Sequence, residues 1–128
     1  MFADYSATDS FLICRSASRL CAFQLEDVAE TMRPQPVDAL PAMPDFLLGV
    51  ALIRGAVVPV VDVAKLIGGV AGIRPERFVT VNLGERQVAF AVQNVLGVRV
   101  LSALAMAEIP LLLHEVDTNS VAAITTLD

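Results

Sequence analysis

The segment from Gly49 to Val63 constrains the fold of this chain most strongly, because two apolar runs flank a single arginine, Arg54. Each run is rich in β-branched residues, has about the length of a strand and is bounded by a glycine or a charge, so each predicts a short buried strand. A tight turn at Arg54 then joins the two strands. An arginine at such a turn indicates a recognition surface, not a catalytic site.

Arg54 itself has three readings from the residues alone. An arginine amid apolar strands extends its charge to solvent, pairs with an internal carboxylate such as Asp62, or faces a partner protein. The sequence pattern leaves these three alternatives open.

Two further segments predict hairpins. Phe11 to Arg15 and Leu20 to Leu25 are rich in strand formers, and a turn centred on Ala17 and Ser18 places Cys14 opposite Cys21. Because strand side chains alternate between faces, one face collects five apolar positions. These are Leu12, Cys14, Cys21, Phe23 and Leu25. The two cysteines are expected to be reduced, buried hydrophobes.

The second hairpin runs from Phe78 to Leu83 and from Arg86 to Val92, with Gly84 able to take a positive φ in the turn. Shifting the chain by 67 residues aligns this hairpin with the first and brings five identities into register. The aligned pairs are Phe11 with Phe78, Arg19 with Arg86, Ala22 with Ala89, Phe23 with Phe90, and Val28 with Val95. The alignment indicates two related β-subdomains, although two unrelated amphipathic hairpins can also align by chance.

The connections are also predicted. Four of the seven prolines fall between Arg33 and Pro44 and exclude regular helix there. Asp62 is a suitable N-cap for a short helix from Val63 to Ile67, which Gly68 ends. The remaining expectations are a frayed tail at 1–10, a loop from Gly68 to Pro75, a helical turn at Ala103 to Ile109 and a strand at Ser120 to Leu127.

Composition excludes several classes of function. The 128 residues suffice for one folding unit, and charges and glycines interrupt every apolar run before the roughly 18 residues of a membrane span. We therefore expect no membrane insertion and, without a signal sequence, a cytoplasmic location. A net charge of −5 with one lysine, Lys65, argues against nucleic acid.

Catalysis, metals and cofactors also lack support in the sequence. His114 is the only histidine, and no nucleophile has an activating context, so we expect no enzyme and no catalytic residue. His114, Glu115 and Asp117 lack the spacing of a recognised zinc site, which favours a solvated loop over a metal site. No glycine-rich phosphate cradle is present, and no cofactor is expected.

The segment Gly49 to Val63 closely resembles the signature of the CheW-like family of chemotaxis coupling proteins, with Leu52 in place of the family's asparagine. The resemblance covers roughly Phe11 to Asp128. Its other parts are the proline-rich connection and three short motifs. These motifs are Leu25-x-x-Val28-x-Glu30, Leu83-Gly84-x-Arg86-x-Val88, and Val95 followed by Gly97-Val98.

The resemblance implies a mainly β fold of two small SH3-like β-barrel subdomains with one or two short helices, forming a single CheW-like domain over residues 11–128. It implies a non-enzymatic adaptor that joins the regulatory domain of a chemotaxis histidine kinase to the cytoplasmic tip of a chemoreceptor in a membrane-bound array. The family pattern places Val28, Glu30, Gly49, Arg54 and Val98 on partner-binding surfaces. Val28 and Val98 are equally well explained as core residues, and Gly49 by backbone geometry.

Two further expectations concern the C-terminus and the competing function. Family members usually continue past a segment like Ile124 to Asp128 with an apolar strand and a helix, so we expect a C-terminally short domain. An open edge at Val121 to Leu127 would favour self-association or completion by a partner strand. The alternative function is a small β-barrel that binds a small ligand in its apolar interior, or that completes another protein, without kinase coupling.

Overall fold

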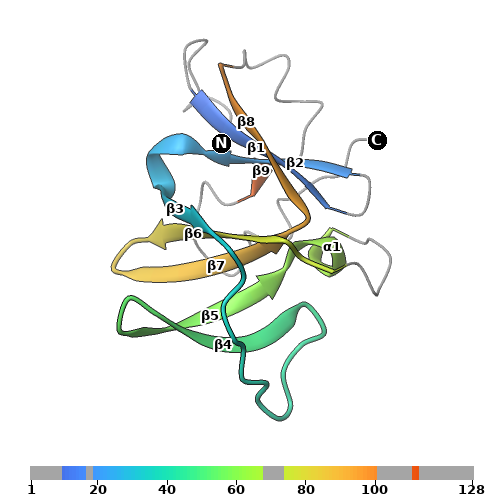
Figure 1. Cartoon of the computed structure of the whole chain (residues 1–128), viewed down its shortest axis with the longest axis vertical. Coiled ribbons are helices and arrows are strands. Elements are labelled where there is room, and N and C mark those ends of the chain that lie inside the picture. Colours follow the sequence, from blue (N-terminus) through green and yellow to red (C-terminus); the bar gives the residue numbers. More distant parts are fainter. Residues whose placement is uncertain (1–9, 17–18, 68–73, 101–110, 113–128) are drawn as a thin grey trace.

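The computed structural model describes residues 10–16, 19–67, 74–100 and 111–112, which form two β-sheets and very little helix (Figure 1). A four-stranded sheet has the strand order β8-β1-β2-β9, and a five-stranded sheet has the order β3-β6-β7-β5-β4. The strands are β1 Ser10–Ser16, β2 Arg19–Gln24, β3 Val28–Met32, β4 Leu47–Ile53, β5 Ala56–Asp62, β6 Arg77–Leu83, β7 Arg86–Val92, β8 Asn94–Val100 and β9 Leu111–Leu112. The expected mainly β architecture is confirmed.

The first hairpin has the predicted register, because Cys14 pairs with Cys21 across β1 and β2. Both cysteines are free and buried, as expected. Leu25 was wrongly assigned to the same buried face. It is 37% exposed, because β2 ends at Gln24 and the chain then makes a 3₁₀ turn at Leu25–Asp27. Ser10, predicted to lie in the terminal tail, is the first residue of β1.

The second hairpin also matches the prediction. Leu83 and Arg86 close a two-residue turn in which Gly84 has a φ of 67°, a conformation that costs glycine little. Each hairpin is followed by a third strand that pairs in the other sheet. β3 follows the first hairpin and pairs with β6, whereas β8 follows the second hairpin and pairs with β1. The two units predicted from the 67-residue shift are therefore interlocked.

The main core lies between the two hairpins. Phe23 and Phe90, which the 67-residue shift aligns, contact each other with ring centroids 5.2 Å apart and planes tilted by 51°, a favourable geometry for aromatic rings. Around them pack buried residues of both sheets and of the short helical segment after β5: Leu12, Cys14, Cys21, Val61, Val63, Ile67, Val79, Val81 and Val92. A second core cluster fills the five-stranded sheet on its other side: Ala51, Ile53, Val58, Val60, Phe78, Ala89 and Ala91.

The five-stranded sheet curls so that its two outer strands approach each other. β3 and β4 stand at opposite ends of the strand order, yet the chain leaving β3 forms a bridge to β4 through two backbone hydrogen bonds between Asp38 and Val50, of 2.8 and 3.0 Å. This bridge lies within the proline-rich connection, where the described structure has no helix, as predicted. The curl brings residues of β3 and of the β4–β5 turn to one side of the molecule.

The predicted helix follows β5. Asp62 caps α1 Val63–Leu66, and its carboxylate accepts hydrogen bonds from the backbone N–H of Ala64 at 3.0 Å and of Lys65 at 3.4 Å. In the part of the chain that the structure describes, no helix is long and apolar enough to span a membrane.

Several predicted segments lie outside the described residues. These are the tail at 1–9, the glycine-rich loop at 68–73, the helical turn at 103–109, the residues around His114 and the strand at 120–127.

Candidate functional site

Arg54 occupies the two-residue turn between β4 and β5. Ile53 pairs with Ala56, and both turn residues have positive φ, 52° at Arg54 and 82° at Gly55. This is the geometry of a type I′ hairpin turn, whose first position normally carries asparagine, aspartate or glycine. A left-handed conformation is unfavourable for arginine by about 1 kcal/mol. The turn therefore holds Arg54 in a strained conformation that a smaller residue would adopt more easily, and such strain often marks functional positions.

Glu30 reaches the same place from β3. The pairing of β3 with β6 is irregular between Val28 and Glu30, where a bulge inserts an extra residue. Bulges turn the following side chain in a new direction. Thr80 on β6 is buried, and its hydroxyl donates a hydrogen bond of 3.3 Å to the carbonyl oxygen of Glu30, which fixes the backbone after the bulge.

Arg54 and Glu30 form a two-pronged ion pair. The Nη2 of Arg54 donates to Oε1 of Glu30 at 2.8 Å, and Nε donates to Oε2 at 3.0 Å. The side chains are 77% and 31% exposed. Hydrogen bonding to Arg54 lowers the pKa of Glu30, and the same bond raises the pKa of Arg54. Both groups stay charged at neutral pH, and the guanidinium keeps N–H groups free of Glu30 for a partner.

Asp62 does not take part in this pair. One interpretation of the sequence paired the carboxylate of Asp62 with Arg54, but this carboxylate caps α1 instead. Glu30 is the actual partner, and it came from the family resemblance without a predicted contact to Arg54.

A surface groove of about 880 Å³ opens beside the ion pair. Its walls are the end of the β4–β5 hairpin and the turn of the β6–β7 hairpin, with Glu30 at one side. The lining residues are Glu30, Ile53, Arg54, Ala56, Val57, Val58, Pro59, Asn82, Leu83, Gly84, Glu85, Arg86, Gln87 and Val88. An apolar floor with charges of both signs at the rim suits a segment of another protein.

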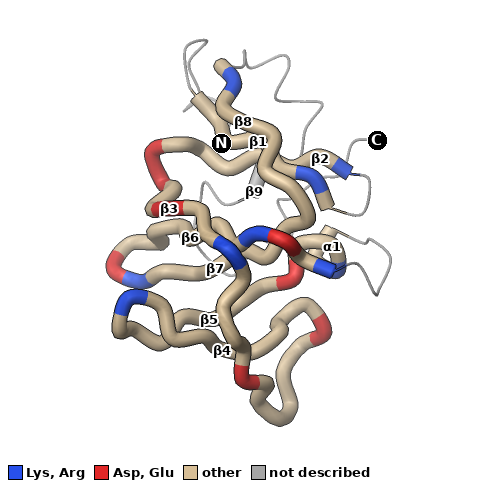
Figure 2. Tube along the Cα trace, in the orientation of Figure 1, with Lys and Arg blue, Asp and Glu red and all other residues tan. Residues whose placement is uncertain are grey.

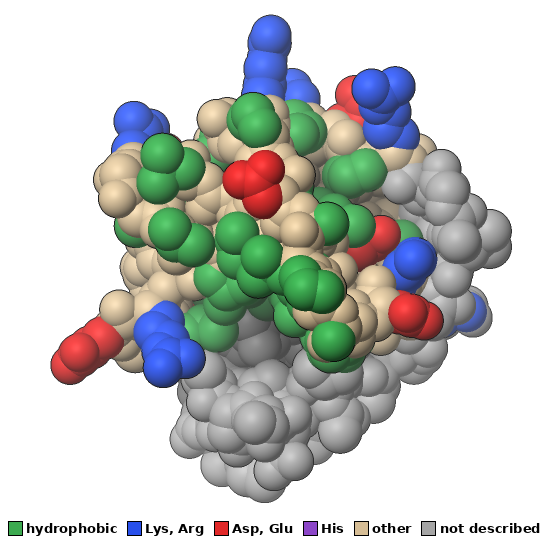
Figure 3. Space-filling view, turned by 90° about the horizontal axis from the view of Figure 1, so that it is seen from below, with side chains coloured by type: hydrophobic (Ala, Val, Ile, Leu, Met, Phe, Trp, Pro, Cys, Tyr) green, Lys and Arg blue, Asp and Glu red, His purple; other side chains and the backbone are tan. Residues whose placement is uncertain are grey.

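Apolar side chains are exposed at the same end of the molecule. Leu52 and Val57 pair across β4 and β5 and are 67% and 70% exposed. The prediction that both strands are buried throughout was therefore wrong near the turn, where the hairpin extends beyond the core. Figure 3 shows apolar side chains gathered on the face seen from below, with most charged groups at its rim. Exposed apolar patches of this kind mark interaction surfaces.

The other three predicted site residues lie apart from the ion pair. Gly49 is a backbone requirement: its φ is 146°, and an added Cβ would lie 2.2 Å from the carbonyl oxygen of Asp38. Val28 packs against the main core. Val98 on β8 is 47% exposed and forms an apolar stripe with Leu96 and Val100, 40% and 62% exposed. The structure thus joins Arg54 to Glu30 alone.

Sequence reasoning missed Thr80 and the exposed pair Leu52 and Val57. Thr80 left no signal, because a threonine in a strand is ordinary. The exposure of Val57 follows from its position near the turn. The register of the two-residue turn pairs it with Leu52 at the end of the hairpin. Within the described residues, no group of three His, Cys, Asp or Glu side chains is arranged to bind a metal ion.

Comparison with known proteins agrees with this architecture. The sequence model of the CheW-like domain matches residues 10–128. The crystal structure of the scaffolding protein TtCheW from Thermoanaerobacter tengcongensis superimposes with a TM-score of 0.69 at 22% identity, covering 74% of this chain and 66% of that chain. This chain therefore spans just under two thirds of that protein. No curated protein matched.

The likeness in structure confirms the expected fold of two small SH3-like β-subdomains with short helices. The match to the sequence model extends over nearly the whole chain and includes both interlocked hairpins as well as the Arg54 turn. This chain belongs to the CheW-like domain family.

Proposed function

We propose that this protein is a non-enzymatic adaptor that couples a chemoreceptor to a chemotaxis-type histidine kinase. Membership of the CheW-like family supports a scaffolding role in chemotaxis signalling. The observation that carries the proposal is the exposed ion pair of Arg54 and Glu30 beside an apolar groove. The protein acts in the cytoplasm and is recruited to membrane-bound receptor arrays through its partners.

The ion pair is suited to recognition because it is already formed before a partner arrives. A strained turn and a bulge hold the two side chains in place, so little conformational freedom is lost on binding. The free N–H groups of Arg54 then meet an acceptor of the partner, while Leu52 and Val57 supply apolar contact area. Arrangements of a few charges around an apolar centre are typical of protein interfaces.

Two partners require two surfaces. The groove and the Arg54–Glu30 pair form one, and the exposed stripe containing Val98 on β8 forms the other. Val28 and Gly49 act by holding β3 and β4 in shape. Signal passes through the adaptor when its contacts differ between the active and inactive states of the kinase. Equal affinity for both states would leave the equilibrium between them unchanged.

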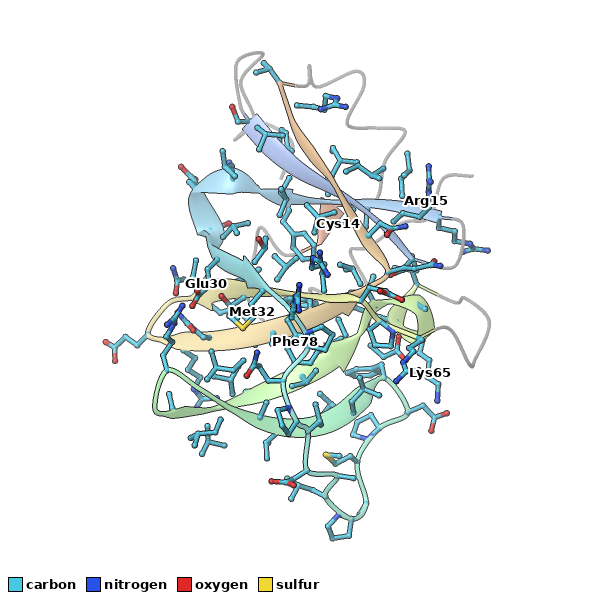
Figure 4. All side chains as sticks on the ribbon, in the orientation of Figure 1. Cys14, Arg15, Glu30, Met32, Lys65 and Phe78 are labelled. Atoms are coloured by element: carbon cyan, nitrogen blue, oxygen red, sulfur yellow. The ribbon has the colours of Figure 1, made fainter. Side chains whose placement is uncertain are left out.

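Calorimetric titration tests the proposal directly. The regulatory domain of a chemotaxis-type histidine kinase and a soluble chemoreceptor tip fragment from the same organism are titrated separately into the wild-type chain and into Arg54→Ala. We expect saturable one-to-one binding of both to the wild type, and at least tenfold weaker receptor binding by the variant, about 1.4 kcal/mol. Arg15→Ala is the matched control, because Arg15 is also exposed but lies on β1 (Figure 4).

Circular dichroism of both variants confirms that the fold is intact. Absence of binding to either partner by the folded wild type would refute the adaptor function. Equal receptor binding by wild type and Arg54→Ala would refute the assignment of Arg54.

A further inference from the structure

Three of the eight arginines of the chain line one surface cleft of about 400 Å³. Its lining consists of Arg33, Pro34, Arg74, Pro75, Glu76 and Arg77. The cleft shares no lining residue with the groove beside Arg54. Figure 2 shows basic positions close together where the end of β3 lies beside the start of β6.

The backbone around the cleft is constrained at each arginine. Arg33 and Arg74 both precede a proline, which restricts each to extended conformations. The N–H of Glu76 donates a hydrogen bond of 2.9 Å to the carbonyl of Val92, and Arg77 is the first residue of β6. The backbone that carries each of the three arginine side chains is therefore restricted in conformation.

The strand register places two of these arginines against each other. Met32 of β3 pairs with Phe78 of β6, and both side chains are labelled in Figure 4. Arg33 follows the last residue of β3, and continuing the antiparallel register by one position sets it opposite Arg77, the first residue of β6. Like charges in this relationship destabilise a sheet.

The other half of the molecule shows that the fold does not require this arrangement. Shifting Arg77 back and Arg33 forward by 67 residues gives Ser10 and Val100, and these two residues do pair between β1 and β8. The equivalent position in the four-stranded sheet is thus uncharged. The charges at Arg33 and Arg77 are therefore not a requirement of this strand pairing.

Little nearby charge offsets the arginines. Glu76 is the one acidic residue that lines the cleft, so the lining carries a charge of +2 in a chain of net charge −5. Within the described part of the chain, no ion pair joins a carboxylate to these arginines. Among the residues that the structure describes, the one side-chain hydrogen bond that these arginines donate runs from Nη1 of Arg77 to the backbone carbonyl of Glu76, at 2.7 Å.

We propose that this cleft binds a small phosphate-bearing molecule. Planar guanidinium groups bind phosphate oxygens through paired hydrogen bonds, and the three arginines that line the cleft supply both the charge and the donors. The cleft volume is that of a small-molecule site. A nucleic acid backbone would need a longer track of basic residues, which this acidic chain lacks. The bound anion also reduces the electrostatic repulsion between Arg33 and Arg77. The proposed anion site does not depend on the proposed adaptor function.

Calorimetric titration with pyrophosphate at constant ionic strength tests the site. We expect saturable binding to the wild type, about tenfold weaker binding by Arg33→Gln and by Arg74→Gln, and tighter binding by Glu76→Gln. Arg99→Gln is the matched control and keeps wild-type affinity, because Arg99 lies on β8 outside the cleft. Parallel titrations with inorganic phosphate and ATP show whether the site selects a free phosphate or a nucleotide.

Thermal unfolding gives a second readout. Without anion, Arg33→Gln should unfold at a higher temperature than the wild type, because one of two opposed charges is gone. Pyrophosphate should raise the unfolding temperature of the wild type more than that of the variant. The proposal is overturned by absence of binding at pyrophosphate on the order of 10 mM, or by equal binding of the wild type and all three cleft variants.

Discussion

Glu30 and Arg54 join the two outer strands of the five-stranded sheet. Glu30 lies on β3 and Arg54 follows β4, the first and last strands in the sheet order, and two hydrogen bonds of 2.8 and 3.0 Å connect them. The pair marks where the sheet closes on itself. It is also exposed, so under the proposed function the same two side chains close the sheet and face a partner.

Exchanging the two charges separates these roles. We expect Arg54→Glu alone to weaken partner binding, and the double variant Glu30→Arg with Arg54→Glu to reform an ion pair without recovering binding, because the partner then meets the opposite pattern of charge. Calorimetry against the kinase regulatory domain and the receptor fragment, with thermal unfolding of each variant, measures both effects. Full recovery of binding by the double variant would show that only the ion pair matters.

Acid should open the ion pair. Hydrogen bonding to Arg54 holds the pKa of Glu30 below its ordinary value of 4.5. A carboxyl group with a lowered folded-state pKa stabilises the fold above its unfolded pKa, and that contribution is lost as the pH falls through the folded value. The carboxyl carbon of Glu30, followed by NMR between pH 7 and 2, should titrate below the ordinary value of 4.5. Titration of Glu30 at or above its ordinary value would contradict the pair in solution.

Gly49→Ala should destabilise the protein more than Gly84→Ala. Both glycines have positive φ, at 146° and 67°, but only at Gly49 does an added Cβ meet the backbone, at 2.2 Å from the carbonyl oxygen of Asp38. We expect a loss of about 3 kcal/mol at Gly49 and about 1 kcal/mol at Gly84. Urea unfolding measures both. Equal losses would mean that the contact between β4 and Asp38 is easily displaced.

The paired cysteines should resist modification in the folded protein. Cys14 and Cys21 are fully buried, and the hydrogen bond between the two thiols, followed by burial, raises the pKa of the Cys21 thiol well above its ordinary value of 9.0. The thiolate that reacts with alkylating reagents is therefore scarce. Because the unfolded chain loses this proton first, the contribution to stability is full below the ordinary pKa and declines as the pH rises above it.

A thiol-specific reagent at pH 8 provides the measurement. We expect labelling at the rate of unfolding, with both cysteines reacting at once in urea. Fast labelling of either cysteine without denaturant would contradict the burial of the pair.

The local structure was largely predictable from the sequence. The two hairpins, the turn at Arg54 and the cap at Asp62 depend on neighbouring residues, and alternation, turn chemistry and capping describe such features well. Leu25 was wrongly assigned because β2 ends at Gln24 and a 3₁₀ turn begins at Leu25. Alternation alone gives no sign of where a strand ends.

The candidate site was less predictable because it depends on contacts distant in sequence. Glu30 and Arg54 meet only after β3 and β4 close the sheet, and a bulge after Val28 sets the direction of Glu30. Bulges and closure follow from the packing of the whole sheet, and no window of sequence contains them. The exposure of Leu52 likewise depends on how far the hairpin extends beyond the core.

The pairing of β3 with β6 and of β8 with β1 has a consequence for folding during synthesis. β1 is synthesised well before one of its two neighbours, β8, which ends at Val100. β3 must likewise wait for β6. Pairings so distant in sequence form slowly, and unpaired strands are prone to aggregate. We therefore expect the two sheets to form together, once β8 has been synthesised, and not one hairpin unit before the other.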